Sequence, residues 1–167
     1  MPTWGSTIIR SRLAGLAVGG LVLAGWGGQG HVSPIMPPPY RAQIPASYDV
    51  TWRALIKSVA AENLPLRVIA RDSGVIATDE VVTPIGLYAD CGRFDDQRIE
   101  GEALVSFTLF AQPNGPHTEV QINAKMRTRT YRQGNSGKPT PTPVYQCAST
   151  GRFEANLLDA VRAAAKP

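Results

Sequence analysis

The sequence predicts an α+β domain in which an antiparallel sheet of about four strands carries an N-terminal and a C-terminal helix on one face. Apolar residues recur at helical spacing near both ends of the folded part, within residues 47–63 and 151–165. Between them, two long runs alternate apolar and polar residues, which is the period of a strand with one buried face. The chain has 167 residues, about one domain's worth, so two helices covering one sheet would give it a single core.

Residues 1–25 have the composition of an export signal. Arg10 and Arg12 give a positively charged start, and Leu13–Ala24 is an uncharged run rich in Leu, Val, Ala and Gly. This run of about twelve residues is shorter than the roughly 20 that a membrane-spanning helix needs. We therefore expect cleavage after Ala24.

The same segment has a second, lipoprotein-like feature. Leu23–Gly25 matches the first three positions of a bacterial lipobox, but Trp26 stands where the lipid-bearing cysteine is required.

Residues 26–46 are dense in Gly and Pro and follow neither secondary-structure period, so we expect a tether there. The folded domain is then predicted to span residues 47–167.

The first helix of this domain is predicted to begin after Ser47, a residue suited to the N-cap. Its apolar face is formed by residues at steps of three and four, namely Tyr48, Trp52, Leu55, Ile56 and Val59. The helix is expected to end near Asn63–Pro65, because the residue before a proline avoids the helical region. Trp52 is expected in the core and not in a ligand site.

Two β-hairpins are predicted next. The first joins Leu66–Asp72 to Val75–Val82, and its acidic residues (Asp72, Asp79 and Glu80) are expected to be solvated at strand edges. The second joins Glu102–Gln112 to Thr118–Arg132 across a loop that contains a glycine. Both faces of Glu102–Gln112 are partly apolar, so we expect this strand to be central.

A row of cations is the candidate binding surface. Lys125, Arg127 and Arg129 alternate with apolar or small residues, which places them on the face opposite the core, with Arg132 near the end of the same strand. Such a row is either a solvated strand face or a patch that attracts an acidic partner or anionic headgroups. The sequence leaves both interpretations open.

The last helix is predicted over Gly151–Ala165, with an apolar stripe that includes Phe153, Leu157 and Val161. Cys91 and Cys147 lie in irregular segments before the long hairpin and before this helix. Because an exported chain meets an oxidising compartment, we predict a disulfide between them.

Other chemistry for the two cysteines is disfavoured. A nucleophilic cysteine needs a neighbouring base, and the only histidines are His31 in the tether and His117 in a hairpin loop. The spacing of the cysteines and histidines also matches no zinc-binding pattern. We expect no catalytic residues, no metal site and no cofactor.

The amino-acid sequence of one segment resembles a known protein family. Residues 48–80, YDVTWRALIKSVAAENLPLRVIARDSGVIATDE, resemble the opening of the BamC-type domain of outer-membrane assembly lipoproteins. The resemblance implies a helix-grip fold, an antiparallel sheet embraced by two helices, and a non-catalytic role in an envelope assembly. Two departures are visible: only one such domain fits here where the family carries two, and Trp26 replaces the lipid-bearing cysteine.

Charge balance disfavours nucleic acid as a partner. Without Arg10 and Arg12 of the signal, the 17 basic residues become 15 against 13 acidic ones. We expect a non-catalytic interaction module, accessory to an outer-membrane or periplasmic assembly, located in the periplasm or on the periplasmic side of the outer membrane. Its expected partners are envelope proteins, with peripheral membrane association as a further contact.

The alternative function is a helix-grip domain that binds a small apolar ligand, or a cryptic hydrolase. Either would use a cavity between the sheet and the helices. A filled core favours the interaction module. A cavity of several hundred cubic ångströms with converging polar groups favours the alternative.

Overall fold

The computed structural model describes residues 30–94, 96–129, 131–133, 139–141 and 143–166. The N-terminal strands and helix are β1 (His31–Val32), β2 (Tyr40–Ile44), α1 (Tyr48–Ala61), β3 (Leu66–Ala70), β4 (Val75–Thr78) and β5 (Val81–Pro84). Then follow β6 (Ala89–Asp90), β7 (Arg93–Phe94), β8 (Gln97–Arg98), β9 (Glu102–Asn114) and β10 (His117–Arg129). The last elements are β11 (Tyr131–Gln133), β12 (Pro139–Pro141), β13 (Gln146–Ser149) and α2 (Arg152–Ala164). The expected export signal of residues 1–25, with Trp26, lies outside the described residues.

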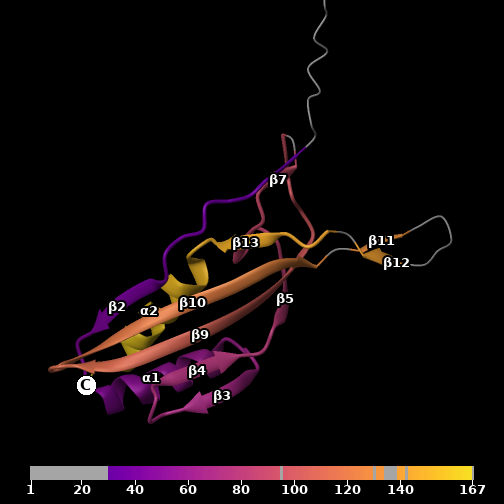
Figure 1. Cartoon of the computed structure of the whole chain (residues 1–167). Helices are drawn as coiled ribbons and strands as arrows, with labels where there is room; N and C mark the ends of the chain where they lie inside the picture. The colour runs from indigo at the N-terminus through magenta and orange to yellow at the C-terminus, as the bar shows by residue number, and fades with distance from the viewer. Residues whose placement is uncertain (1–29, 95, 130, 134–138, 142, 167) are drawn as a thin grey trace, which may run out of the picture.

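A large antiparallel sheet of eight strands dominates the described residues, which contain two helices beside it (Figure 1). The predicted α+β fold with a sheet of about four strands is therefore wrong, because the structure is mostly β. Only two of the strands are long. The others have two to five residues each, too few to show a period in the sequence, and they join the sheet by pairing with the long strands or with one another.

The centre of the sheet is the hairpin of β9 and β10. Their ladder runs without interruption from the pair Arg129 and Glu102 to the pair His117 and Asn114. The connection is thus a two-residue turn, Gly115–Pro116, tighter than the loop that the sequence predicted. Gly115 has φ +60, the left-handed conformation that glycine adopts without steric cost. The expectation that β9 is central is confirmed, since it pairs on both sides.

β4 and β5 lie end to end beside β9 and are separated by a β-bulge. Ala77 pairs with Thr108 and Val81 pairs with Val105, so four steps on one strand face three on the other. The extra residue at Asp79–Glu80 breaks the run that the sequence predicted as one strand, Val75–Val82. Bulges of this kind redirect side chains.

β2 and β13 share the other side of β10 in the same way. β2 pairs with Thr118–Ile122, and β13 pairs with Met126 and Arg127. The structure therefore differs from the expected tether over residues 26–46: Tyr40–Ile44 is a sheet strand, and the Ile44 side chain is fully buried. The reason lies in tertiary packing, because Ile44 joins the core only when β2 pairs with β10.

Both helices contribute to one core with the inner face of the sheet (Figure 1). α1 contacts β9 and β10, and α2 contacts β2 and α1. Both agree with the predicted helices within two residues at each end, although Ser47 at the N-cap makes no side-chain capping hydrogen bond. Phe107 of β9 and Phe153 of α2 stack in this core with ring centroids 3.7 Å apart. In the described part of the chain, neither helix is long and apolar enough to span a bilayer.

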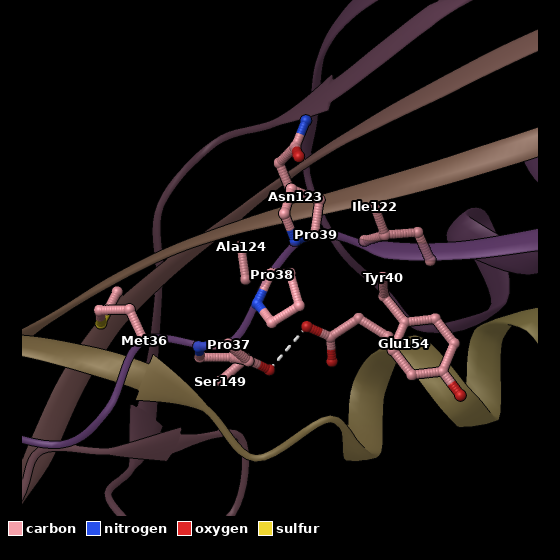
Figure 2. Close-up of a pocket in the computed structure, with 10 residues that line it drawn as sticks. All are labelled: Met36, Pro37, Pro38, Pro39, Tyr40, Ile122, Asn123, Ala124, Ser149 and Glu154. Atoms are coloured by element: carbon pink, nitrogen blue, oxygen red, sulfur yellow. Dashed lines mark hydrogen bonds between the residues drawn. The ribbon is translucent and has the colours of Figure 1, made fainter.

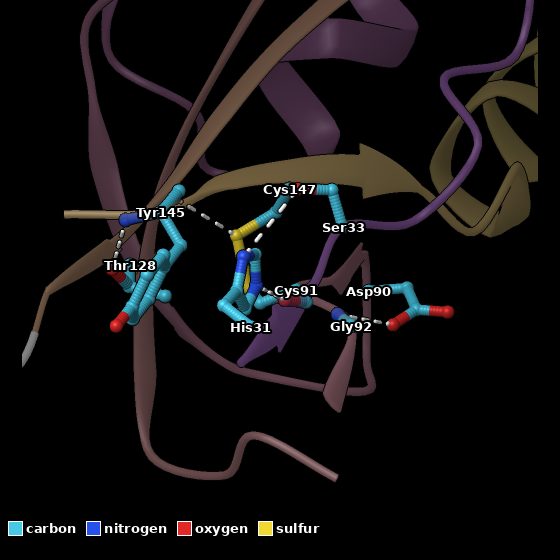
Figure 3. The surroundings of a disulfide bond; sticks show 8 residues. All are labelled: His31, Ser33, Asp90, Cys91, Gly92, Thr128, Tyr145 and Cys147. Atoms are coloured by element: carbon cyan, nitrogen blue, oxygen red, sulfur yellow. Dashed lines mark hydrogen bonds between the residues drawn. A yellow bond between two sulfur atoms is a disulfide. The ribbon is translucent and has the colours of Figure 1, made fainter. Parts of the chain in front are cut away.

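The predicted disulfide is confirmed: Cys91 and Cys147 are bonded at an S–S distance of 2.05 Å (Figure 3). β6 and β13 pair antiparallel, with Ala148 opposite Asp90, so Cys147 and Cys91 occupy the next opposing positions. Their Cα atoms are 4.1 Å apart, close to the spacing of opposed residues that share no backbone hydrogen bond. Both cysteines are buried, and His31 stacks on Tyr145 beside them.

Candidate functional site on the open face of the sheet

The open face of the sheet is the surface that the sequence singled out. Alternation along β9 and β10 turns one set of side chains into the core and leaves the other half-buried or exposed. Lys125, Arg127 and Arg129 belong to the second set, since Met126 and Thr128 between them are buried. The predicted orientation of these three cations is confirmed.

Arg132 does not continue this row. β10 ends at Arg129, and Arg132 lies in β11, which pairs with β12 in a separate two-stranded sheet that extends beyond the end of β10 (Figure 1). The sequence predicted one strand through Arg132 because the alternation continues across the boundary. The candidate surface on the main sheet is thus reduced to three of the four predicted cations.

Arg127 is already engaged within the chain. Its guanidinium donates two hydrogen bonds to Glu80, from Nε to Oε1 at 3.2 Å and from Nη2 to Oε2 at 2.8 Å. Bidentate pairs of this type fix both side chains in one geometry. The sequence interpretation missed this pair, because it expected Glu80 to be solvated at a strand edge.

The bulge explains how Glu80 reaches the open face. In an unbroken strand Asp79 and Glu80 would point to opposite faces, but the extra residue between Ala77 and Val81 lets both line the same hollow. Asp79 forms a second ion pair, with Arg67 Nε at 3.7 Å. The adjacent acids Asp79 and Glu80 were visible in the sequence, but their position near the row of cations was not, because it depends on the bulge.

Together these groups surround an open hollow of about 440 Å³ on the sheet. Ser106, Thr108 and Lys125 also line this hollow. Among the residues that the structure describes, Lys125 and Arg129 form no ion pair. The face therefore offers two available cations beside two paired acids, which is a surface of mixed charge and not a uniformly basic one.

Within the described ranges, no three or more His, Cys, Asp or Glu side chains come together in a way that could hold a metal ion. No protein-family model matches the chain, and no curated protein sequence matches it. The site is therefore described by its own geometry, an open hollow lined by acidic, basic and hydroxyl-bearing side chains.

Proposed function

We propose that this protein is a non-catalytic interaction domain of the cell envelope, and that the open face of the sheet around Lys125 binds an acidic segment of another envelope protein. The observation that carries the proposal is the charge of this face, at Lys125 beside the hollow and farther along β10. Lys125 and Arg129 are exposed cations without an ion-pair partner among the described residues, while Arg127 is held in place by Glu80. Exposed cations of this kind steer an acidic partner and raise its association rate at low salt.

The buried disulfide supports a location outside the cytoplasm. Structural disulfides persist in oxidising compartments such as the periplasm and are rare in the cytosol. The bond between Cys91 and Cys147 belongs to the core and is not a surface thiol pair, since both residues are at most 1% exposed. The proposed location is the periplasm or the periplasmic side of the outer membrane.

The packing between sheet and helices favours a protein partner over a small apolar ligand. A ligand pocket of the helix-grip type would lie between the inner sheet face and the helices. At the centre of that space Phe107 and Phe153 stack directly on each other, and Leu157 and Leu158 are fully buried beside them. The open face offers instead a shallow hollow, the shape that a protein surface or an extended segment can cover.

A photo-crosslinking side chain in place of Thr108 tests the proposal in intact cells. Thr108 lines the hollow, so a bound envelope protein should form a discrete adduct that mass spectrometry identifies. The double substitution Lys125→Gln and Arg129→Gln should reduce the adduct several-fold and weaken its dependence on salt, since both cations are removed.

The matched control removes two exposed cations elsewhere, by Arg53→Gln and Lys57→Gln on α1. This variant has the same change of charge and should form the adduct normally. The proposal fails if the double variant on the sheet forms as much adduct as the unchanged protein. It also fails if a crosslinker at Lys57 captures the same protein equally well.

A further inference from the structure

Along one edge of β10, a stretch without backbone pairing separates the part paired with β2 from the part paired with β13. β2 pairs with β10 as far as Ile122, and β13 resumes at Met126, so neither strand pairs with Asn123–Lys125. The chain opposite this gap is the proline run Pro37–Pro39. Proline has no N–H to donate to a ladder, so β2 can begin only after the run ends. A cavity of about 100 Å³ remains at this place.

A carboxylate forms part of the wall of this cavity. Glu154, in the first turn of α2, lines it together with Tyr40, Ser149 and the proline run, and Figure 2 shows its carboxylate between Ser149 and the Tyr40 ring. The residue is only 3% exposed. A glutamate this deeply buried ordinarily has partners for both of its oxygens.

Only one of the two oxygens is satisfied. The Ser149 hydroxyl donates its only proton to Oε1 of Glu154 at 2.6 Å and accepts from the Gly151 N–H at 3.0 Å, so it has no proton left for Oε2. Oε2 of Glu154 is buried and has no hydrogen-bond partner in the part of the chain that the structure describes. A buried, unpaired carboxylate oxygen is costly, and a donor supplied from outside removes that cost.

We propose that this cavity is a binding site for a primary ammonium group, with Glu154 as its counter-ion. One carboxylate matches a single positive charge, and an ammonium is a compact donor that needs only one free oxygen. The proline and tyrosine side chains that line the cavity suit the aliphatic stem of an alkylamine, and the Tyr40 ring lies beside the Glu154 carboxylate (Figure 2). The proline run that forms one wall of the cavity is exposed to solvent.

Two other cations fit less well. A divalent metal ion requires about six oxygen ligands, whereas this cavity supplies a single carboxylate. A guanidinium binds a carboxylate through both oxygens, and Oε1 of Glu154 is already occupied by Ser149. The ammonium is therefore the ligand class that the geometry selects. The site lies at the gap beside β10 and does not depend on the function proposed for the open face.

Titration of the full chain with n-butylammonium, followed by amide NMR, tests the site directly. We expect n-butylammonium to cause saturable changes in the amide chemical shifts of Tyr40 and Ala124. The neutral analogue n-butanol should cause no such changes. Glu154→Gln keeps the shape but removes the charge, and it should weaken binding by about tenfold or more. Asp159→Asn, an equal change of charge at an exposed position of α2, should leave binding unchanged.

A second variant keeps the proposal testable if Glu154→Gln does not fold. Ser149→Ala frees Oε1, so n-butylguanidinium should gain affinity relative to n-butylammonium, a change of preference that a merely structural role of Glu154 would not produce. Putrescine and Nα-acetyl-lysine amide then distinguish a free polyamine from a lysine side chain as the source of the ammonium. The proposal is overturned if n-butylammonium gives no saturable shift, if n-butanol binds as well, or if Ser149→Ala leaves the preference unchanged.

Discussion

Replacement of Ile44 by alanine tests whether β2 belongs to the folded domain. The Ile44 side chain is fully buried between β10 and the helices, although it lies in a Gly/Pro-rich stretch that looks like a spacer in sequence. Truncation of a fully buried isoleucine costs about 2–5 kcal/mol, through lost burial and the cavity left behind. We expect the free energy of unfolding to fall by that amount.

The neighbouring residue provides the control. Gln43 lies on the same strand but is exposed on the open face, so Gln43→Ala should change the free energy of unfolding by no more than about 0.5 kcal/mol. Urea denaturation at equilibrium, monitored by circular dichroism, measures both variants. For a domain of this size each kcal/mol corresponds to roughly 3–6 °C, so the expected loss of about 2–5 kcal/mol should lower Tm by roughly 6–30 °C.

Equal stability of the two variants would contradict this account. It would mean that β2 separates from β10 in solution and that the folded domain begins at α1. A change in the denaturant dependence for Ile44→Ala alone would indicate partial unfolding of the native state, and hydrogen exchange along β2 would then locate it.

Three further results are expected. Replacing Cys91 and Cys147 together by alanine should lower the free energy of unfolding, measured in urea, by up to about 4 kcal/mol. This is the chain-entropy value for a sequence separation of 56. A loss below about 1 kcal/mol would mean that the crosslink is redundant. A double-mutant cycle on Arg127 and Glu80 should give a coupling of about 0.2–1 kcal/mol that decreases with salt, because the pair is a third exposed, and zero coupling at low salt would contradict the bidentate geometry. Burial raises the pKa of the Tyr48 phenol above its ordinary 10.0, so the stability from this group is present below pH 10 and is lost as the pH rises through the raised value. Tyr48→Phe should flatten the alkaline decline in stability, and an unchanged decline would assign it to other groups.

Long, regular elements could be predicted from the sequence. Alternation identified β9 and β10 and the orientation of Lys125, and helical spacing identified α1 and α2 within two residues at each end. The disulfide followed from two cysteines in a chain with an export-like start. These features depend on periods or pairs that the sequence itself displays.

The number of strands and the details of the site could not be predicted. β2 is preceded by three prolines and has the composition of a spacer, so its place in the sheet depends on β10. The bulge at Asp79–Glu80 is invisible to a periodicity argument, and it decides that Glu80 reaches Arg127. The unsatisfied oxygen of Glu154 faces a cavity that also involves residues 36–40, residues 122–124 and Ser149, which are far apart in the sequence or lie in another element.

The shared position of β2 and β13 beside β10 affects how the chain can fold. Ile44 pairs with Thr118 and Tyr40 with Ile122, residues 74 and 82 positions later in the chain. β13 then completes the same side of β10 from the opposite end of the sequence. Contacts so far apart must await closure of a long loop, which slows folding. A chain that emerges from its N-terminus could therefore complete this side of the sheet only after nearly all of it had emerged.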